Sequence, residues 1–261
     1  MISIITPVRN SNAFIETYIR SLLSQTDKRF ELVIVNDGST DDVEQMLSER
    51  LKELPDVRVI TQAHSGILSA TLNGIRNCKG DYVAFVDSDD IIVPEFIAEL
   101  NRCTQTCQPD LMLYKNASYR EYPCQINDDT NAVKDFSANK RDVIKTFFLT
   151  SKYRTLSEKC IRKELLENED LSDLCGIKHA PDVALSIYPI LHANTIIHLD
   201  KTLYFAPIRH VTTNKSYVDR RYQDYRRIYA YTLNVLKRDR SEKSLIYDAQ
   251  AMFLDFTLFS L

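Results

Sequence analysis

"DYVAFVDSDD", residues 81–90, is the stretch of sequence that decides the fold. Five apolar residues follow one another from Tyr82, and the run stops at three acids, Asp87, Asp89 and Asp90. A strand that is apolar on both faces is typical of a parallel sheet covered by helices on both sides. The stretch therefore predicts a buried strand whose end carries concentrated negative charge.

Strand-like and helix-like patterns alternate on the N-terminal side of this stretch. Strands are predicted at 2–8, 30–37 and 57–62, and helices at 13–25, 41–54 and 66–78. This alternation with short connections predicts an α/β fold with a doubly wound, mostly parallel, Rossmann-like sheet. Ligands bind such sheets beyond the carboxyl ends of the strands, so Asp37 is expected at the same edge as Asp87 and Asp89.

The regular alternation ends after a helix predicted at 94–105. Beyond it the sequence predicts a strand at 110–119, a polar loop at 123–140, helices at 141–150, 158–168 and 181–193, and one or two strands at 195–208. Because no Gly/Ser/Pro linker separates the halves, we expect residues 1–105 and 106–215 to be two halves of one domain. Residues 216–261 are expected to form a helical C-terminal extension, whose apolar end indicates either a dimer surface or a lost covering segment.

Composition restricts the class of protein. The net charge of −3 argues against a nucleic-acid binder, because such proteins carry a basic excess. The sequence has neither a basic leader with a cleavage site nor a run of about 18–20 apolar residues that could span a membrane. The six cysteines are then expected to be reduced thiols of a cytoplasmic protein.

The acids at 87–90 suit a cation. The chain has only five glycines and neither of the two common glycine-rich phosphate loops. A phosphorylated ligand at this edge is therefore expected to be held through Mg²⁺ or Mn²⁺, bound by carboxylate oxygens. The alternative is a turn followed by the N-cap of the helix near Pro94, which would account for Asp90.

The stretch "VNDGSTDD", residues 35–42, also has two interpretations. Ser39, Thr40 and Asp41 are good N-cap residues, and Asp41 with Glu44 resembles a capping box. Asp37 precedes the cap, and we expect its carboxylate to be free to accept a hydrogen bond from the edge of a base.

An ordered series of motifs resembles a known family. The series comprises "SIITPVRN" (3–10), "VIVNDGSTD" (33–41), "GILSATLNGI" (66–75), "GDYVAFVDSDD" (80–90) with "VP" (93–94), "EKCIRKELL" (158–166) and "PDVALS" (181–186). Over residues 1–213 this series is similar to the inverting nucleotide-sugar glycosyltransferases of family 2, which have the A-type glycosyltransferase fold. The resemblance implies that residues 1–105 bind the nucleotide sugar and 106–215 the acceptor.

The resemblance also implies roles at the donor site. Pro7 would line the nucleotide pocket, and Asp37 would read a uracil or thymine ring. Asp87 resembles the acid near the ribose, and Asp89 resembles the ligand of Mn²⁺ or Mg²⁺. The implied reaction moves a sugar from a nucleotide diphosphate, with UDP as the expected nucleotide, to a hydroxyl of a glycan or lipid-linked acceptor. The implied process is cell-surface polysaccharide or lipopolysaccharide synthesis.

Three more residues take their roles from the resemblance. Asp182 resembles the general base, because a carboxylate near an acceptor hydroxyl can remove its proton as it attacks the sugar. Arg209 and His210 fall in a loop that closes over the diphosphate in many relatives. Arg209 is therefore a candidate for phosphate contact, and His210 is a candidate metal ligand.

The chain departs from the family pattern at three positions. Arg9 stands where the family usually has an aromatic residue, Thr71 stands in place of an expected cationic contact, and Pro181 replaces the Glu before the base. An inactive nucleotide-sugar-binding or scaffold module therefore stays open as an alternative. A sugar-phosphate nucleotidyltransferase is the second alternative, although it needs a glycine-rich loop that "TPVRNSNAF" (6–14) does not offer.

The basic, tyrosine-rich segment 216–240 leaves its own alternatives open. Its arginines suit the anionic inner face of a membrane, where lipid-linked acceptors are found. They equally suit a solvated helix whose tyrosines pack on the domain.

Overall fold

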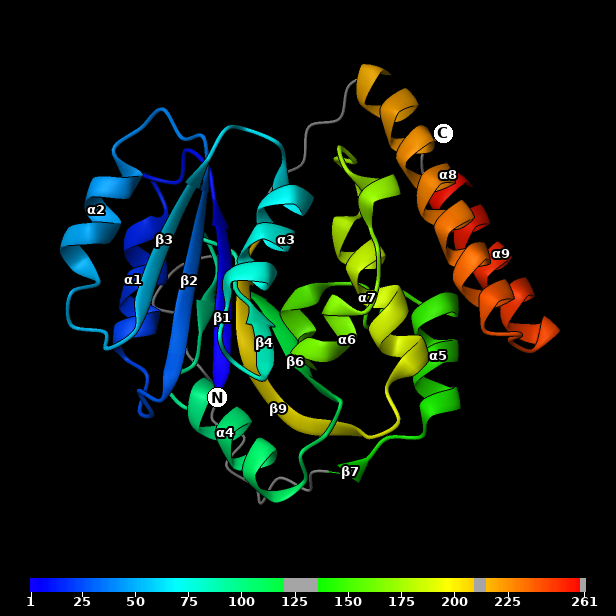
Figure 1. Cartoon of the computed structure of the whole chain (residues 1–261), viewed down its shortest axis with the longest axis horizontal. Helices are drawn as coiled ribbons and strands as arrows, with labels where there is room; N and C mark the ends of the chain where they lie inside the picture. The colour runs from blue at the N-terminus through cyan, green and yellow to red at the C-terminus, as the bar shows by residue number, and fades with distance from the viewer. Residues whose placement is uncertain (120–135, 209–214, 259–261) are drawn as a thin grey trace.

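The first four strands form the parallel part of one sheet (Figure 1). The computed structural model describes residues 1–119, 136–208 and 215–258. Strands β1 (Ile2–Val8), β2 (Phe30–Asp37), β3 (Val57–Gln62) and β4 (Tyr82–Phe85) lie in the order β3-β2-β1-β4 and are parallel. Every residue of β2 and β4 is buried, as their apolar runs predict. The expectation of a doubly wound sheet is confirmed for this half.

The second half extends the same sheet with mixed directions. Beyond β4 lie β8 (Lys159–Arg162), β6 (Leu111–Tyr119), β9 (Ile196–Pro207) and β5 (Ile91–Ile92), with β7 (Phe136–Ser137) also on β9. β8 is antiparallel to both β4 and β6, whereas β6 and β9 are parallel. β5 pairs antiparallel with β9, which brings β9 beside the end of β4.

The predicted helix at 158–168 is wrong in its first half. Lys159–Arg162 forms β8 in the middle of the sheet, and only Lys163–Glu167 is helical, as α6. Cys160 and Ile161 are fully buried between β4 and β6. The hydrogen bonds and burial supplied by these two distant strands outweigh the local helical preference of the segment.

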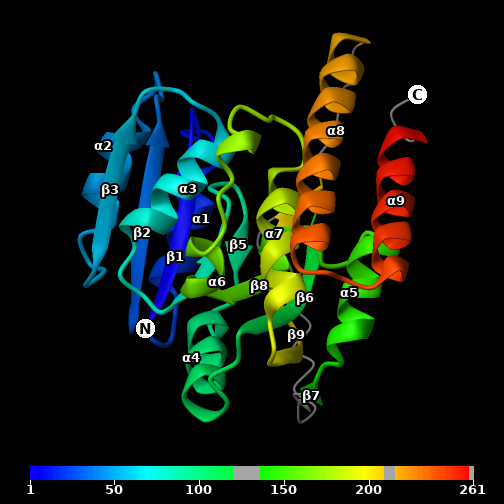
Figure 2. The same cartoon turned by 45° about the vertical axis from the view of Figure 1, so that its right-hand side comes forward.

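Helices cover both faces of the sheet (Figures 1 and 2). One face packs against α1 (Ile15–Leu23), α2 (Val43–Arg50) and α4 (Phe96–Thr106). The other packs against α3 (Ile67–Asn77), α5 (Lys140–Leu149), α6 and α7 (Pro181–His192). Gly74 lets α3 approach the sheet closely, because a Cβ there would lie 2.5 Å from Cγ2 of Ile5.

The helical C-terminal extension is confirmed as α8 (Lys215–Arg238) and α9 (Lys243–Leu258), which pair beside α5 and α7 (Figure 2). Tyr225, Ile228 and Tyr231 are buried on α8 and join the core of the domain. The burial of Tyr225 and Tyr231 shows that part of the basic, tyrosine-rich face packs on the domain, and Arg221 donates from Nε to the Tyr225 hydroxyl at 2.8 Å within the helix. Among the described residues no helix has the length and apolar character that a membrane span requires. Most of the loop expected at 123–140 lies outside the described residues.

Candidate active site

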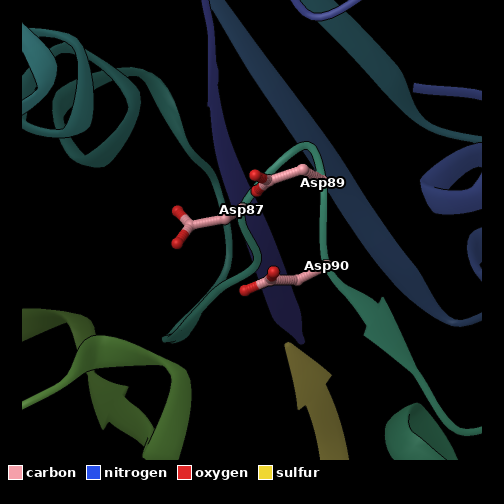
Figure 3. Close-up of side chains that lie close together, drawn as sticks. All are labelled: Asp87, Asp89 and Asp90. Atoms are coloured by element: carbon pink, nitrogen blue, oxygen red, sulfur yellow. The ribbon is translucent and has the colours of Figure 1, made fainter. Parts of the chain in front are cut away.

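The three acids lie in one tight turn between β4 and β5 (Figure 3). The backbone N–H of Asp90 donates to the carbonyl oxygen of Asp87 at 3.1 Å and closes the turn. Carboxylate oxygens of Asp87, Asp89 and Asp90 all lie within 4.8 Å of one another, and Figure 3 shows the three side chains on the same side of the turn. Three carboxylates so close repel one another unless a cation lies among them. This set of hard oxygen donors fits Mg²⁺ or Mn²⁺.

Asp90 is held by Tyr204 of β9, the strand that pairs with β5. The fully buried Tyr204 hydroxyl donates to Oδ2 of Asp90 at 2.6 Å and accepts the backbone N–H of Asp87 at 3.1 Å. Burial raises the pKa of Asp90 to about 6, the Tyr204 hydrogen bond opposes this, and the negative charge of Asp182 adds to it. The N-cap interpretation of Asp90 is wrong, because α4 begins at Phe96 and its N-cap residue is Glu95.

Asp37 lies at the carboxyl end of β2, at the edge where the sequence predicts it. Oδ1 accepts hydrogen bonds from Gln62 Nε2 and the Ser65 N–H, both at 2.8 Å. Oδ2 contacts His64 Nδ1 at 2.8 Å and accepts the Gly66 N–H at 2.9 Å. Burial acts to raise the pKa of Asp37, but these hydrogen bonds outweigh it and the pKa is lowered. The expectation that this carboxylate is free is wrong: it holds the loop at 62–66.

The capping box expected from Asp41 and Glu44 does not form. The N-cap residue of α2 is Asp42, without a side-chain cap, and Glu44 instead accepts from Asn36 Nδ2 at 2.8 Å. Oδ2 of Asp41 accepts the backbone N–H of Asn12 at 2.9 Å. These polar side chains therefore fasten the loop after β2 to its neighbours at the sheet edge.

Three loops of the sheet edge are joined by short-range hydrogen bonds. Asn10 of the loop after β1 accepts the Thr40 N–H at 2.9 Å, and its own N–H donates to Ser39 Oγ at 3.1 Å. Ser11 Oγ lies 2.8 Å from Ser88 Oγ of the acidic turn. The ends of β1, β2 and β4 are thereby held in fixed relation.

These loops enclose a cleft of about 690 Å³. Residues from five parts of the chain line it: Pro7, Val8, Arg9, Asn10, Ser11, Phe14, Asp37, His64, Ser65, Gly66, Ile67, Ser88, Asp89, Gly176, Ile177 and Lys178. The sequence-predicted residues Pro7, Asp37 and Asp89 thus meet at one cavity. Arg9 and Lys178 supply positive charge from opposite segments, and within the described part of the chain neither forms an ion pair.

Asp182 lies at the start of α7, away from the lining of this cleft. Its Oδ2 accepts the backbone N–H of Leu156 at 3.2 Å. Burial raises the pKa of Asp182, while the Leu156 hydrogen bond and the charge of Lys159 oppose the rise. The negative charge of Asp182 also contributes to the raised pKa of Asp90.

Lys159 is the cation whose charge acts to lower the pKa of Asp182. It is fully buried in β8, and its Nζ donates to the Thr155 carbonyl oxygen. Burial lowers its pKa to about 8, and the charges of Glu158 and Asp182 oppose the lowering. A buried ammonium group beside Asp182 favours the ionised form of that carboxylate.

Of the remaining candidate residues, the structure describes Thr71 and Pro181 but not Arg209 and His210. Thr71 is buried in α3, where its hydroxyl donates to the Ile67 carbonyl oxygen at 2.8 Å, and Pro181 is the first residue of α7. Sequence reasoning missed Tyr204 and Lys178, and no local pattern marks either of them: Tyr204 stands 114 positions from Asp90.

With this geometry in place, comparison with known proteins identifies the family. The model of glycosyl transferase family 2 matches residues 3–161, more than half of the chain. The chain belongs to glycosyl transferase family 2. The predicted family is confirmed.

One curated protein and one solved structure illustrate what the chain is similar to. The uncharacterized glycosyltransferase EpsJ of Bacillus subtilis (strain 168) is 31% identical over 210 residues, which cover 78% of this chain and 60% of EpsJ. The crystal structure of S. aureus TarS 1-349 has a TM-score of 0.72 at 25% identity, covering 98% of this chain and 71% of that one. This chain spans about three fifths of the length of EpsJ and of a second curated relative, EpsH of the same strain.

Two structures with ligands share the fold. S. aureus TarS 1-349 in complex with UDP-GlcNAc has a TM-score of 0.66 at 22% identity, covering 98% of this chain and 81% of that one. Mannosyltransferase PcManGT from Pyrobaculum calidifontis, in complex with GDP-Man and Mn²⁺, has a TM-score of 0.58 at 15% identity, covering 99% and 73%. The A-type fold expected from the sequence is confirmed.

Proposed function

We propose that this chain is a metal-dependent inverting glycosyltransferase that moves a sugar from a UDP-sugar to a hydroxyl group of a glycan or lipid-linked acceptor. The observation that carries the proposal is the acidic turn, in which three carboxylates lie close together and Asp89 lines a cleft of about 690 Å³. The TarS complex with UDP-GlcNAc and the PcManGT complex with Mn²⁺ support a nucleotide sugar and a cation as its occupants.

Donor binding is assigned to the cleft lining. Pro7 would pack against the base. Asp37 would hold the loop 62–66 so that the backbone of this loop and the side chain of His64 face the base. Asp87 would contact the ribose, and Asp89 would hold Mn²⁺ or Mg²⁺. Asp90 would support them from behind through Tyr204, because a buried carboxylate fixed by a hydrogen bond cannot swing toward solvent.

Arg9 and Lys178 are assigned to the diphosphate. Both line the cleft and are exposed, and neither forms an ion pair with a described residue. A chain without a glycine-rich phosphate loop needs such cations, because few backbone N–H groups are available to the phosphates. Arg9 stands where relatives usually have an aromatic residue. Its guanidinium would contact the diphosphate, whereas an aromatic side chain would stack on the base.

Asp182 is assigned as the general base. It would take the proton of the acceptor hydroxyl as that oxygen attacks the anomeric carbon, and the bond to the nucleoside diphosphate breaks on the opposite face, which inverts the configuration. When bound, a divalent cation neutralises the charge that develops on the departing diphosphate. Lys159 would keep Asp182 ionised between turnovers.

The acceptor is proposed to be a growing cell-surface polysaccharide or lipopolysaccharide, extended in the cytoplasm. A lipid-linked form would bring the enzyme to the inner face of the membrane. Arg220 and Arg226 of α8 are exposed and would face anionic headgroups there.

The test is UDP binding by calorimetry with Mn²⁺ and with a chelator. The wild type should bind UDP only with Mn²⁺, and Asp89→Asn should weaken binding at least about tenfold, since a metal ligand is lost. Asp42→Asn is the matched control, because Asp42 is exposed and makes no capping hydrogen bond. UDP binding unaffected by chelator and by Asp89→Asn would refute the proposal, and tight binding without transfer to any acceptor would favour a binding module.

A further inference from the structure

The segment 173–179 forms one wall of the cleft and leads directly into α7. Gly176, Ile177 and Lys178 of this segment line the cleft, and Asp182 follows three residues after it. The segment is irregular: Gly176 has φ of 83° and the next residue after the segment, Ala180, has φ of 52°. An alanine in this region carries a steric cost of roughly 1–2 kcal/mol, so tertiary contacts must hold the backbone there.

Two side chains of α8 provide such contacts. Oδ2 of Asp224 accepts the backbone N–H of Lys178 at 2.9 Å and that of His179 at 3.1 Å, and it lies 2.8 Å from Nδ1 of His179. Arg227 donates from Nη2 to the carbonyl oxygens of Asp173 and Cys175. Four backbone groups of one short segment are thus satisfied by one turn of α8.

Burial makes the Asp224 contact strong. Asp224 is 8% exposed and His179 is 9% exposed, so both groups are largely removed from water. A carboxylate that accepts N–H groups in such surroundings forms charge-assisted hydrogen bonds, which are about twice as strong as neutral ones. Removing it would leave the buried N–H of His179 and the part-buried N–H of Lys178 without this acceptor.

We propose that Asp224 and Arg227 are positioning residues, through which α8 holds the segment 173–179 in the cleft wall and fixes the approach to Asp182. The inference rests on the proposed function for the identity of the ligand, and it makes α8 part of the donor site rather than an appended extension. Neither side chain touches the ligand; each acts through the backbone that Lys178 and Asp182 stand on.

A second histidine–aspartate pair, at the other end of α7 and α8, supplies a matched control. Asp239, directly after α8, lies 2.8 Å through Oδ2 from Nε2 of His192, the last residue of α7. This pair also joins α7 to the end of α8, but it does not border the cleft. A role of Asp224 that is only to dock α8 would be shared by Asp239.

The first measurement is hydrogen–deuterium exchange on the full chain, which does not depend on any ligand. In Asp224→Ala, the amides of Lys178 and His179 should exchange at least about tenfold faster than in the wild type, because their acceptor is lost. Asp224→Asn should lie between the two, since an amide oxygen accepts more weakly. Asp239→Ala should leave these amides unchanged. Unchanged exchange in Asp224→Ala, or equal acceleration in Asp239→Ala, overturns the inference.

The second measurement is UDP binding with Mn²⁺ by calorimetry. Asp224→Ala should weaken UDP binding at least about tenfold, in line with the loss of an ordered cleft wall, while Asp239→Ala stays within about twofold. Faster exchange with undiminished UDP affinity overturns the role in the cleft. A wild type that binds no UDP refutes the proposed function instead, and the exchange result still decides whether α8 holds the segment.

A second pair of variants tests the inference even if Asp224→Ala does not fold. Arg227→Gln removes the two contacts to carbonyl oxygens at an exposed position, and Arg226→Gln changes its exposed neighbour, whose guanidinium lies over the ring of Tyr222. Exchange at residues 174–178 should rise in Arg227→Gln and not in Arg226→Gln. The same exchange pattern in both variants overturns the inference.

Discussion

Replacing Asp37 by Asn should destabilise the protein far more than the loss of one surface charge would. The two carboxylate oxygens of Asp37 are engaged with four groups, two on each oxygen. An asparagine has one acceptor oxygen, so its NH₂ group must face two of these donors. The variant therefore loses two charge-assisted hydrogen bonds. The two groups that donated them then face the NH₂ group of the asparagine, which is itself a donor.

The expected magnitude follows from these bonds. A hydrogen bond to a charged group contributes roughly 1.5–3 kcal/mol, so two lost bonds set a range of about 3–6 kcal/mol. His64 is half exposed and can turn to water, which recovers part of the loss. We expect the free energy of unfolding to fall by about 3 kcal/mol.

Urea denaturation at pH 7 measures this change. Asp41→Asn is the control from the same loop, because among the described residues Oδ2 of Asp41 accepts only the Asn12 N–H and Oδ1 is buried without a partner. The control should change the unfolding free energy by less than about 1 kcal/mol. A loss below about 1 kcal/mol in Asp37→Asn would refute the assignment of these four contacts.

The pH dependence of the difference has a defined sign. Because the folded-state pKa of Asp37 is lowered, its stabilisation is fully present above the unfolded pKa of about 3.9 and is lost as the pH falls through the folded pKa. The gap between the wild type and Asp37→Asn should therefore be constant near neutral pH and shrink below about pH 4. A gap that widens on acidification would contradict the lowered pKa.

Three further predictions concern the cleft and its support. Asp182→Asn should reduce the transfer rate at least about a hundredfold while UDP affinity is preserved. In the wild type, the transfer rate should already fall at a pH above 3.8, the ordinary pKa of Asp, because burial raises the pKa of this base. A pH–rate profile of both proteins measures these effects. Tyr204→Phe should lower the unfolding free energy by about 2–4 kcal/mol and weaken Mn²⁺-dependent UDP binding, since the Asp90 carboxylate loses its donor and the Asp87 N–H its acceptor; unchanged stability in urea would contradict this. Arg9→Ala combined with Lys178→Ala should weaken UDP binding and flatten its dependence on salt, whereas an unaltered salt dependence would show that neither cation meets the diphosphate.

The sequence predicted the parallel half of the fold from patterns that lie within each segment. The apolar runs of β2 and β4 required burial on both faces, and short connections required crossovers to the same sheet. These two facts place Asp37 and Asp89 at one edge, where both line the cleft. The meeting of these residues was predictable because the end of a parallel strand is fixed by topology alone.

Where local preference and tertiary pairing disagreed, the local interpretation was wrong. Lys159–Arg162 has helical preference but forms a strand, because β4 and β6 offer backbone partners on both sides. Asp41 and Glu44 have the spacing of a capping box, yet Asn12 and Asn36 compete for their carboxylates. In each case the competing partner belongs to another part of the chain.

The sequence by itself determined the sheet edge, the acidic turn and the family. Only the tertiary structure decided which group supports each acid: Tyr204 for Asp90, the loop 62–66 for Asp37, and α8 for the segment before Asp182. The physical reason is that strand and helix periods are set by neighbouring residues, whereas a buried carboxylate must find its donors wherever packing brings them. Such partners stand tens to a hundred positions away, and no local pattern records them.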